Sequence, residues 1–169
     1  MVQPSGGKRS LQPAFDAAVS QGRSRRAALG CPNSQWLATG DDDCFLPLPP
    51  SMANVTADDA LEICHDIEAT SSLPEILDDE DQQMVHELSG GSNIWLGLRR
   101  SSSTSAWVWP SGKAAIFTKW ANEQPVQGDE NCVYMNFAQG AWYNSYCNSG
   151  SDTNIALCYV KWKEEMDKQ

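Results

Sequence analysis

Ile94-Trp95-Leu96-Gly97-Leu98 is the stretch that decides the fold, because it is an unbroken apolar run of the length of one strand. A short run of this composition predicts a buried strand. The residues after it predict a β-rich second half, with further strands expected at 106–109, 116–120, 132–137, 141–143 and 155–160. The polar segment between Trp120 and Cys132 predicts a long ordered loop, and loops of that kind usually carry function.

Two helices are expected upstream of this β region. Thr56-Ala57-Asp58-Asp59 has the pattern of a capping box, with Thr56 as the N-cap and Asp59 as the third helical residue. The apolar residues after it recur at helical spacing and predict one buried face, formed by Ala57, Ala60, Leu61, Cys64 and Ile67. A second helix is predicted from Asp78 to Leu88, with an acidic first turn and with Gly90-Gly91 as its stop.

Six cysteines in a chain of 169 residues indicate a disulfide framework, although the sequence alone leaves about fifteen pairings open. A structural zinc site is disfavoured, because there is no Cys-x-x-Cys pair and the two histidines, His65 and His86, lie far apart in sequence. Asn54-Val55-Thr56 is an N-glycosylation sequon, so we expect a glycan on Asn54. The cysteines and the sequon both indicate the secretory pathway.

Taken in order, these landmarks resemble the C-type lectin-like domain in its long form, with three disulfides. The residues that carry the resemblance are Cys31-Pro32, Trp36, Cys44, Cys64, Trp95-Leu96-Gly97-Leu98, Trp107-Val108-Trp109 with Gly112, Trp120, Pro125, Cys132, Trp142, Cys147 and Cys158. The resemblance covers residues 31–162 and implies an α+β fold, with two helices flanking antiparallel β-hairpins and a long polar loop. It also implies the disulfides Cys31–Cys44, Cys64–Cys158 and Cys132–Cys147, and a mostly buried place for Trp95, Trp107, Trp109 and Trp120.

Members of this family that bind sugar do so through a Ca²⁺ ion held by the long loop, and the resemblance marks where that site would lie. The matching positions are Gln124-Pro125-Val126, Glu130 and Trp142-Tyr143-Asn144. Calcium takes about six to eight oxygen ligands and binds more tightly when more of them are charged. Val126 has no side-chain oxygen, Tyr143 offers a neutral phenol, and Asn144 lacks the charge of an aspartate.

We therefore expect Ca²⁺ to bind weakly if at all, with Gln124, Glu130 and Asn144 as its ligands. Nearby oxygens would substitute if the loop shifted, namely those of Glu123, Gln127 and Asp129. The stretch Arg99-Arg100-Ser101-Ser102-Ser103-Thr104-Ser105 lacks the carboxylates of an auxiliary calcium site found in some members. The resemblance also implies that the Gln124–Pro125 peptide bond can adopt the cis form, and the trans form stays open where no Ca²⁺ holds the loop.

The long-loop face is the expected recognition surface. Its expected ligand-binding residues are Gln124, Val126, Gln127, Glu130, Tyr143 and Asn144. We expect an extracellular recognition module for a glycan or for a cell-surface or secreted protein, with its calcium-dependent sugar site degraded and with no cofactor required. A Ca²⁺-dependent galactose-type lectin with an altered site stays open as the alternative, because Gln124 is the residue type of the galactose-preferring members.

The sequence does not predict an enzyme, because the residues that could perform catalysis have simpler structural explanations. His65 and His86 fall on the two helices and have no predicted nucleophile beside them. The acidic runs 41–43 and 78–81 are typical of solvated faces, and there is no Gly-rich phosphate loop.

Charge is unevenly distributed along the chain. The net charge is −10, yet residues 1–30 hold five of the 12 basic residues and one of the 22 acidic ones, so the remainder is strongly acidic. Such a domain repels phosphate backbones, and no nucleic-acid partner is expected. No stretch approaches the ~18 apolar residues of a membrane span. We expect a secreted protein, or the extracellular part of a longer chain.

Residues 1–30 are expected to be a disordered stalk or pro-segment that the domain does not need, so a chain starting at Ala27 should melt within a few degrees of the full one. The spacing of Leu11, Phe15 and Val19 would also allow a short helix. Arg23-Ser24-Arg25-Arg26 resembles a proprotein-processing site and is equally compatible with a basic linker. Residues 163–169 form a charged tail.

Overall fold

The computed structural model describes residues 30–39, 43–149 and 154–161; the charged tail and all of the predicted stalk except Gly30 lie outside these ranges. The elements, in chain order, are β1 (Leu37–Ala38), β2 (Asp43–Pro47), η1 (Pro50–Met52), α2 (Ala57–Ile67), α3 (Asp79–Leu88), β3 (Asn93–Arg99), β4 (Cys132–Met135), β5 (Trp142–Ser145), β6 (Asn154–Ile155) and β7 (Leu157–Lys161). The predicted α+β class, with two helices ahead of a β-rich half, is confirmed.

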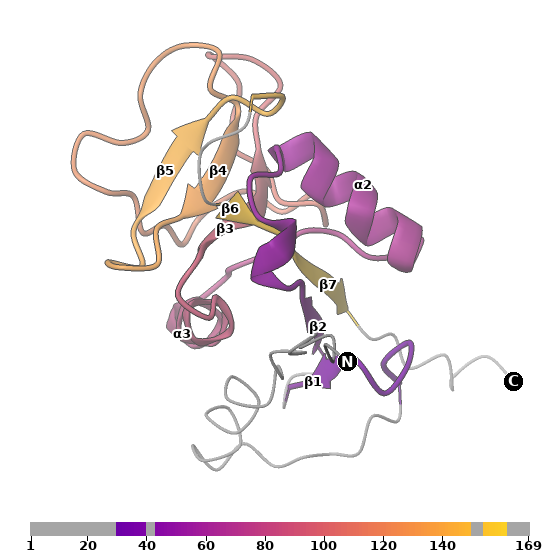
Figure 1. The fold of residues 1–169 in the computed structure, drawn as a ribbon. Helices are drawn as coiled ribbons and strands as arrows, with labels where there is room; N and C mark the ends of the chain where they lie inside the picture. Colours follow the sequence, from indigo (N-terminus) through magenta and orange to yellow (C-terminus); the bar gives the residue numbers. More distant parts are fainter. Residues whose placement is uncertain (1–29, 40–42, 150–153, 162–169) are drawn as a thin grey trace, which may run out of the picture.

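The strands form two sheets, and Figure 1 shows α2 and α3 on opposite sides of them. The first sheet has the order β1-β2-β7 and is antiparallel throughout. The second has the order β5-β4-β3-β6, in which only the β3–β6 pair is parallel. The second sheet positions the expected site, because β5 is an edge strand of this sheet and β4 directly follows the long loop.

Both helices begin as predicted. Thr56 Oγ1 accepts a hydrogen bond from the Asp59 backbone N–H at 3.0 Å, and the Asp59 carboxylate accepts from the Thr56 N–H, so the capping box is present. The Asp78 side chain accepts from two backbone N–H groups at the start of α3. The buried face of α2 is shorter than predicted: Ile67 was expected to belong to it, but Ile67 is the last helical residue and is 43% exposed.

The second half of the chain departs from the predicted strands at three places, and at one of them the expected closing strand 155–160 is split into β6 and β7, which belong to different sheets. In the described residues, 106–109 and 116–120 form only isolated bridges, from Val108 to Arg99 and Ala114 and from Trp120 to Trp142. Aromatic rings hold this region instead: Trp107 lies 5.2 Å from Trp120 between ring centroids, and Trp120 lies 5.9 Å from Trp142. Ile116 is 94% exposed, whereas a half-buried strand would have turned its side chain toward the core.

The core lies around β3, as the central apolar run predicts. Trp95 and Trp109 are buried, whereas Trp107 and Trp120 are partly buried and pack against the core. Two of the four indoles are therefore fully buried, as expected, and two only in part. Gly97 marks a close approach, because a Cβ there would lie 2.7 Å from Pro110 Cγ and 2.8 Å from the Leu73 carbonyl oxygen.

The three disulfides pair as the resemblance implies. Cys31–Cys44 ties the segment before β1 to β2, Cys64–Cys158 ties α2 to β7, and Cys132–Cys147 ties the first residue of β4 to the segment after β5. The bridge of α2 to β7 spans a sequence separation of 94 residues. In the chain-entropy model a loop of that length stabilises the fold by about 4–5 kcal/mol.

Candidate functional site

The long loop, residues 121–131, runs from the bridge between Trp120 and Trp142 to the start of β4. The disulfide of Cys132 with Cys147 pins the loop where it joins β4. The Gln124–Pro125 peptide bond inside the loop is cis, the form that the resemblance implies it can adopt. The loop therefore has an ordered base on which its other residues are placed.

Asn144 on β5 holds the middle of the loop through its side-chain amide. Its Oδ1 accepts from the Val126 backbone N–H at 2.8 Å, and its Nδ2 donates to the carbonyls of Val126 and Glu130 at 3.0 and 2.8 Å. Its own backbone N–H donates to Gln124 Oε1 at 3.0 Å. Asn144 is only 7% exposed, so these hydrogen bonds are shielded from water.

Arg100 holds the same loop from the other side. Its Nη2 donates to the carbonyls of Val126, Gly128 and Glu130 at 3.2, 3.0 and 3.3 Å. Its Nε donates to Asn131 Oδ1 at 2.9 Å, and Nη1 makes a longer contact with the Ser103 carbonyl at 3.4 Å. The guanidinium carbon lies 4.6 Å from the centroid of Trp107, and the residue is 7% exposed.

Glu130 is the one carboxylate that the structure places inside this set. Its Oε2 is buried and has no hydrogen-bond partner in the described structure, and a Cβ at Gly128 would overlap that carboxylate. A hydrogen bond with the Glu130 side chain, and then its charge, raises the pKa of the Tyr146 phenol above its ordinary value. Tyr146 is 47% exposed and Val126 is 39% exposed, so both reach the surface beside Glu130.

Tyr143 lies apart from the other predicted site residues. Successive residues of a strand point to opposite faces, so Tyr143 and Asn144 diverge on β5. The Tyr143 ring stacks on Tyr134 with centroids 5.5 Å apart, and its hydroxyl donates a long hydrogen bond to Gln139 Oε1 at 3.4 Å. Burial, and then the neighbouring Tyr143, raises the pKa of Tyr134. Gln127 is exposed in the loop.

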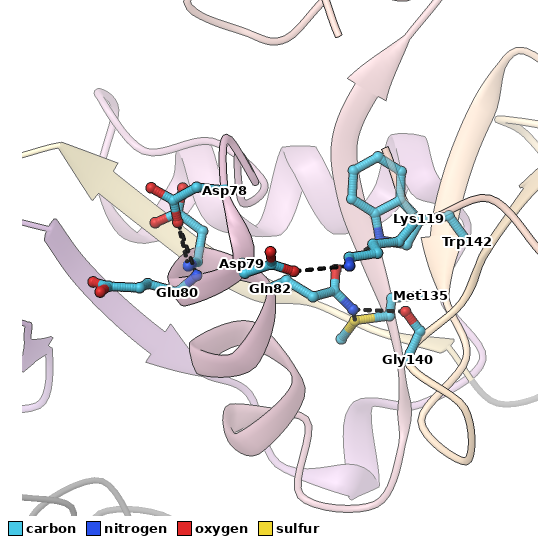
Figure 2. A network of polar contacts seen from close by, with 9 residues as sticks. Asp78, Asp79, Glu80, Gln82, Lys119, Met135, Gly140 and Trp142 are labelled. Atoms are coloured by element: carbon cyan, nitrogen blue, oxygen red, sulfur yellow. Dashed lines mark hydrogen bonds and ion pairs between the residues drawn. The ribbon is translucent and has the colours of Figure 1, made fainter. Parts of the chain in front are cut away.

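A network between α3 and β5 supports the base of the site, as Figure 2 shows. Gln82 Nε2 donates to the Gly140 carbonyl at 2.6 Å, and Gln82 Oε1 accepts from the buried Trp142 indole N–H at 2.9 Å. Lys119 and Asp79 form an ion pair at 2.8 Å, which links the segment before the loop to the first turn of α3.

Calcium, which the resemblance brings into question, does not fit these residues as they are arranged. The amide oxygens of Gln124 and Asn144 each already accept one backbone N–H, and Glu130 is the single carboxylate among the three expected ligands. No group of three or more His, Cys, Asp and Glu side chains suited to a metal occurs among the residues that the structure describes. Calcium takes about six to eight oxygen ligands and prefers charged ones, whereas these three residues supply one carboxylate and two amide oxygens that already serve the loop backbone.

Sequence reasoning missed three residues that shape the site: Arg100, Tyr146 and Gln82. Tyr146 had a detectable signal, because it is an aromatic residue two positions beyond Asn144, directly after the end of β5. Arg100 and Gln82 had none, because their partners lie tens of residues away in the chain. The histidines are placed as expected: His65 is exposed on α2, and His86 Nε2 donates to the Phe137 carbonyl. Within the described residues no helix is long and apolar enough to cross a membrane.

Comparison with known proteins places the chain in a family. Residues 53–160 match the model of the lectin C-type domain. The chain is 31% identical over 98 residues to the C-type lectin lectoxin-Lio3 of Erythrolamprus poecilogyrus, covering 53% of this chain and 61% of that protein. It is 31% identical over 120 residues to lectin BRA-2 of Megabalanus rosa, covering 70% of this chain and 65% of that lectin. The chain thus spans somewhat less than two thirds of either relative.

Among solved structures, the cow carbohydrate-recognition domain of CD23 superposes with a TM-score of 0.65 at 20% identity, over 79% of this chain and 98% of that one. That likeness confirms the fold predicted from the cysteine and tryptophan landmarks. With the family model and the three disulfides of the long form, it leads to one assignment. The chain belongs to the C-type lectin domain family, whose domains are non-enzymatic binding modules.

Proposed function

We propose that this domain recognises a glycan or protein ligand through its long-loop face, without calcium, in an extracellular setting. The observation that carries the proposal is the internal use of the amide oxygens of Gln124 and Asn144, which hydrogen-bond within the site. A sugar whose hydroxyls had to complete a metal shell would find no metal there. Recognition then depends on direct contacts with the face itself.

The exposed part of this face has the composition of a contact surface. Val126 and Tyr146 provide apolar area, and Gln127 and Glu130 lie beside them with hydrogen-bonding groups. Tyrosine gives large contact area at a small cost in conformational entropy, and amides adapt to many hydrogen-bonding partners. Tyr143 would contribute from the neighbouring side of β5, beside Tyr134.

A glycan is the first class of ligand to test. Two proteins that the chain resembles are named as lectins, and the cow CD23 domain was solved in the presence of an oligosaccharide. The experiment is a glycan array, paired with a screen of cell-surface proteins, run in calcium and again in EDTA. Binding that survives EDTA supports the proposal, and binding that EDTA abolishes contradicts it.

The two tyrosines test which part of the face makes the contact. Tyr143→Ala and Tyr146→Ala should each be measured by calorimetry against the ligand found on the array. A loss of more than ~1 kcal/mol of binding free energy marks an anchor residue. If both variants bind as tightly as the unaltered protein, the ligand docks elsewhere on the domain.

A second candidate is a Ca²⁺-dependent galactose-type lectin with an altered site. The buried Glu130 Oε2 favours it, because an unpartnered carboxylate oxygen is costly to bury and a cation would satisfy it. This candidate requires that Gln124 and Asn144 either offer the metal the second lone pair of their amide oxygens or release their backbone partners. Galactose binding that depends on calcium would establish it in place of the metal-free function.

The extracellular setting is supported by the three disulfides, because such bridges persist in oxidising compartments. Asn54 is exposed and lies two residues before Thr56, the N-cap of α2, so a glycan on Asn54 would not disturb the core. Expression in a secretory host, followed by glycosidase treatment, should give a mass shift that Asn54→Gln removes.

A further inference from the structure

Arg100 is a cation almost fully removed from water, and in the described residues none of the ion pairs involves it. A buried charge without a counter-charge persists only where dipoles solvate it. Here those dipoles are carbonyl oxygens, and three of them belong to the loop at every second residue: Val126, Gly128 and Glu130. They converge on one nitrogen, Nη2, which has only two hydrogens, so at least one hydrogen is shared.

Convergence of this kind requires a positive charge at its centre. Three carbonyls that point to one place repel each other, and a neutral side chain would offset that repulsion poorly. Hydrogen bonds from an ionised donor are about twice as strong as neutral ones, and the planar guanidinium offers its donors in fixed directions. The indole of Trp107 covers the guanidinium and adds a cation–π contact.

Arg100 and Asn144 act on the same two groups. The carbonyls of Val126 and Glu130 each accept one hydrogen bond from Arg100 Nη2 and one from Asn144 Nδ2. A carbonyl oxygen has two lone pairs, so both are used. The positions of the Val126 and Glu130 side chains follow from this clamp.

We propose that Arg100 is the positioning residue of the long-loop face, its guanidinium ordering the loop in the place of a bound metal ion. The proposal rests on the metal-free recognition proposed above and explains how that face keeps its shape. Arg100 touches no ligand; it acts through the backbone of Val126, Gly128 and Glu130.

The test is hydrogen exchange of the whole protein, resolved by peptide and performed in EDTA without any ligand. Arg100→Gln removes the charge and the fork of donors. The matched control is the neighbouring Arg99→Gln, which removes a partly exposed guanidinium paired with Asp58 at 2.8 Å. The amides of Val126 and Asn144, both donors inside the site, report on the loop. The Tyr159 amide, which donates to the Ser72 carbonyl at 2.8 Å, reports on the core.

In Arg100→Gln we expect loop exchange to accelerate by about tenfold or more, the factor that the loss of a charge-assisted hydrogen bond implies. Core exchange should change by less than about twofold in that variant, and loop exchange in Arg99→Gln should stay within the same limit. Arg100→Lys, which keeps the charge and loses the fork, should lie between Arg100→Gln and the unaltered protein.

Unchanged loop exchange in folded Arg100→Gln overturns the proposal, and so does an equal acceleration in loop and core. If Arg100→Gln does not fold, Arg100→Lys decides by the same comparison of loop with core. The unaltered protein is also measured in calcium and in EDTA. Loop protection that appears only in calcium overturns both the metal-free function and the Arg100 proposal, whereas loop protection that persists in EDTA and also in folded Arg100→Gln overturns the Arg100 proposal alone.

Discussion

Gln82→Ala tests whether α3 holds the base of the recognition face. The substitution leaves the indole N–H of Trp142, a residue with no exposed surface, without its acceptor, and it takes from the Gly140 carbonyl a donor at 2.6 Å. An unsatisfied buried polar group costs about 1–3 kcal/mol. With two groups affected, we expect the free energy of unfolding to fall by about 2–4 kcal/mol.

Urea denaturation under non-reducing conditions, followed by tryptophan fluorescence, measures this change. Gln83→Ala is the matched control, because Gln83 is exposed on the same helix, and an exposed substitution should cost less than one that deprives buried groups of their partners. Gln82→Glu keeps an acceptor for Trp142 and loses the donor to Gly140, so it should fall between the two. If Gln82→Ala matches the Gln83→Ala control, the network does not support β5.

Three further outcomes are expected. Replacing Cys64 and Cys158 together by Ala should lower the free energy of unfolding by about 4–5 kcal/mol, and a loss below about 2 kcal/mol in urea denaturation would contradict the entropic argument. Val126→Asp with Asn144→Asp should raise calcium affinity in calorimetry, because each change adds a carboxylate; no gain would mean that the loop cannot form the site. Burial raises the pKa of Tyr159 well above its ordinary value of 10.0, so stability should fall as the pH rises past about 10, where only the unfolded phenol ionises. Tyr159→Phe should flatten that fall in pH-dependent denaturation.

The parts of the fold that the sequence predicts well are those set by local chemistry. The Thr56 capping box, the Asp78 cap and the apolar run of β3 each follow from neighbouring residues. The disulfide pairing needed the family resemblance, because six cysteines alone permit many connectivities. The predicted strand at 116–120 failed because alternation shows only which residues could face inward. It does not show whether a partner strand is present, and here aromatic rings hold the segment.

The sequence suggests which residue types lie at the candidate site, but it does not show which hydrogen bonds they make. Gln124 and Asn144 do lie together, but each uses its oxygen on the backbone, which depends on distances that no local pattern encodes. The resemblance grouped Tyr143 with Asn144, because both match the same ligand triplet of the family, although the alternation of β5 separates them. In the sequence, Arg100 stands out only as part of a segment without carboxylates. Its role in the loop is not visible there, because its carbonyl partners lie 26 to 30 residues further along the chain.

The first sheet determines how the domain would respond to tension along the chain. Asp43 on β2 pairs with Lys161 on β7, so the first residue of β2 and the last residue of β7 lie side by side. A force that pulls those ends apart would open the ladder one pair at a time instead of shearing it. The opening would stop at Cys158, which is bonded to Cys64 on α2. The long loop leads into β4 of the other sheet, so tension on these two strand ends would not act directly on the recognition face.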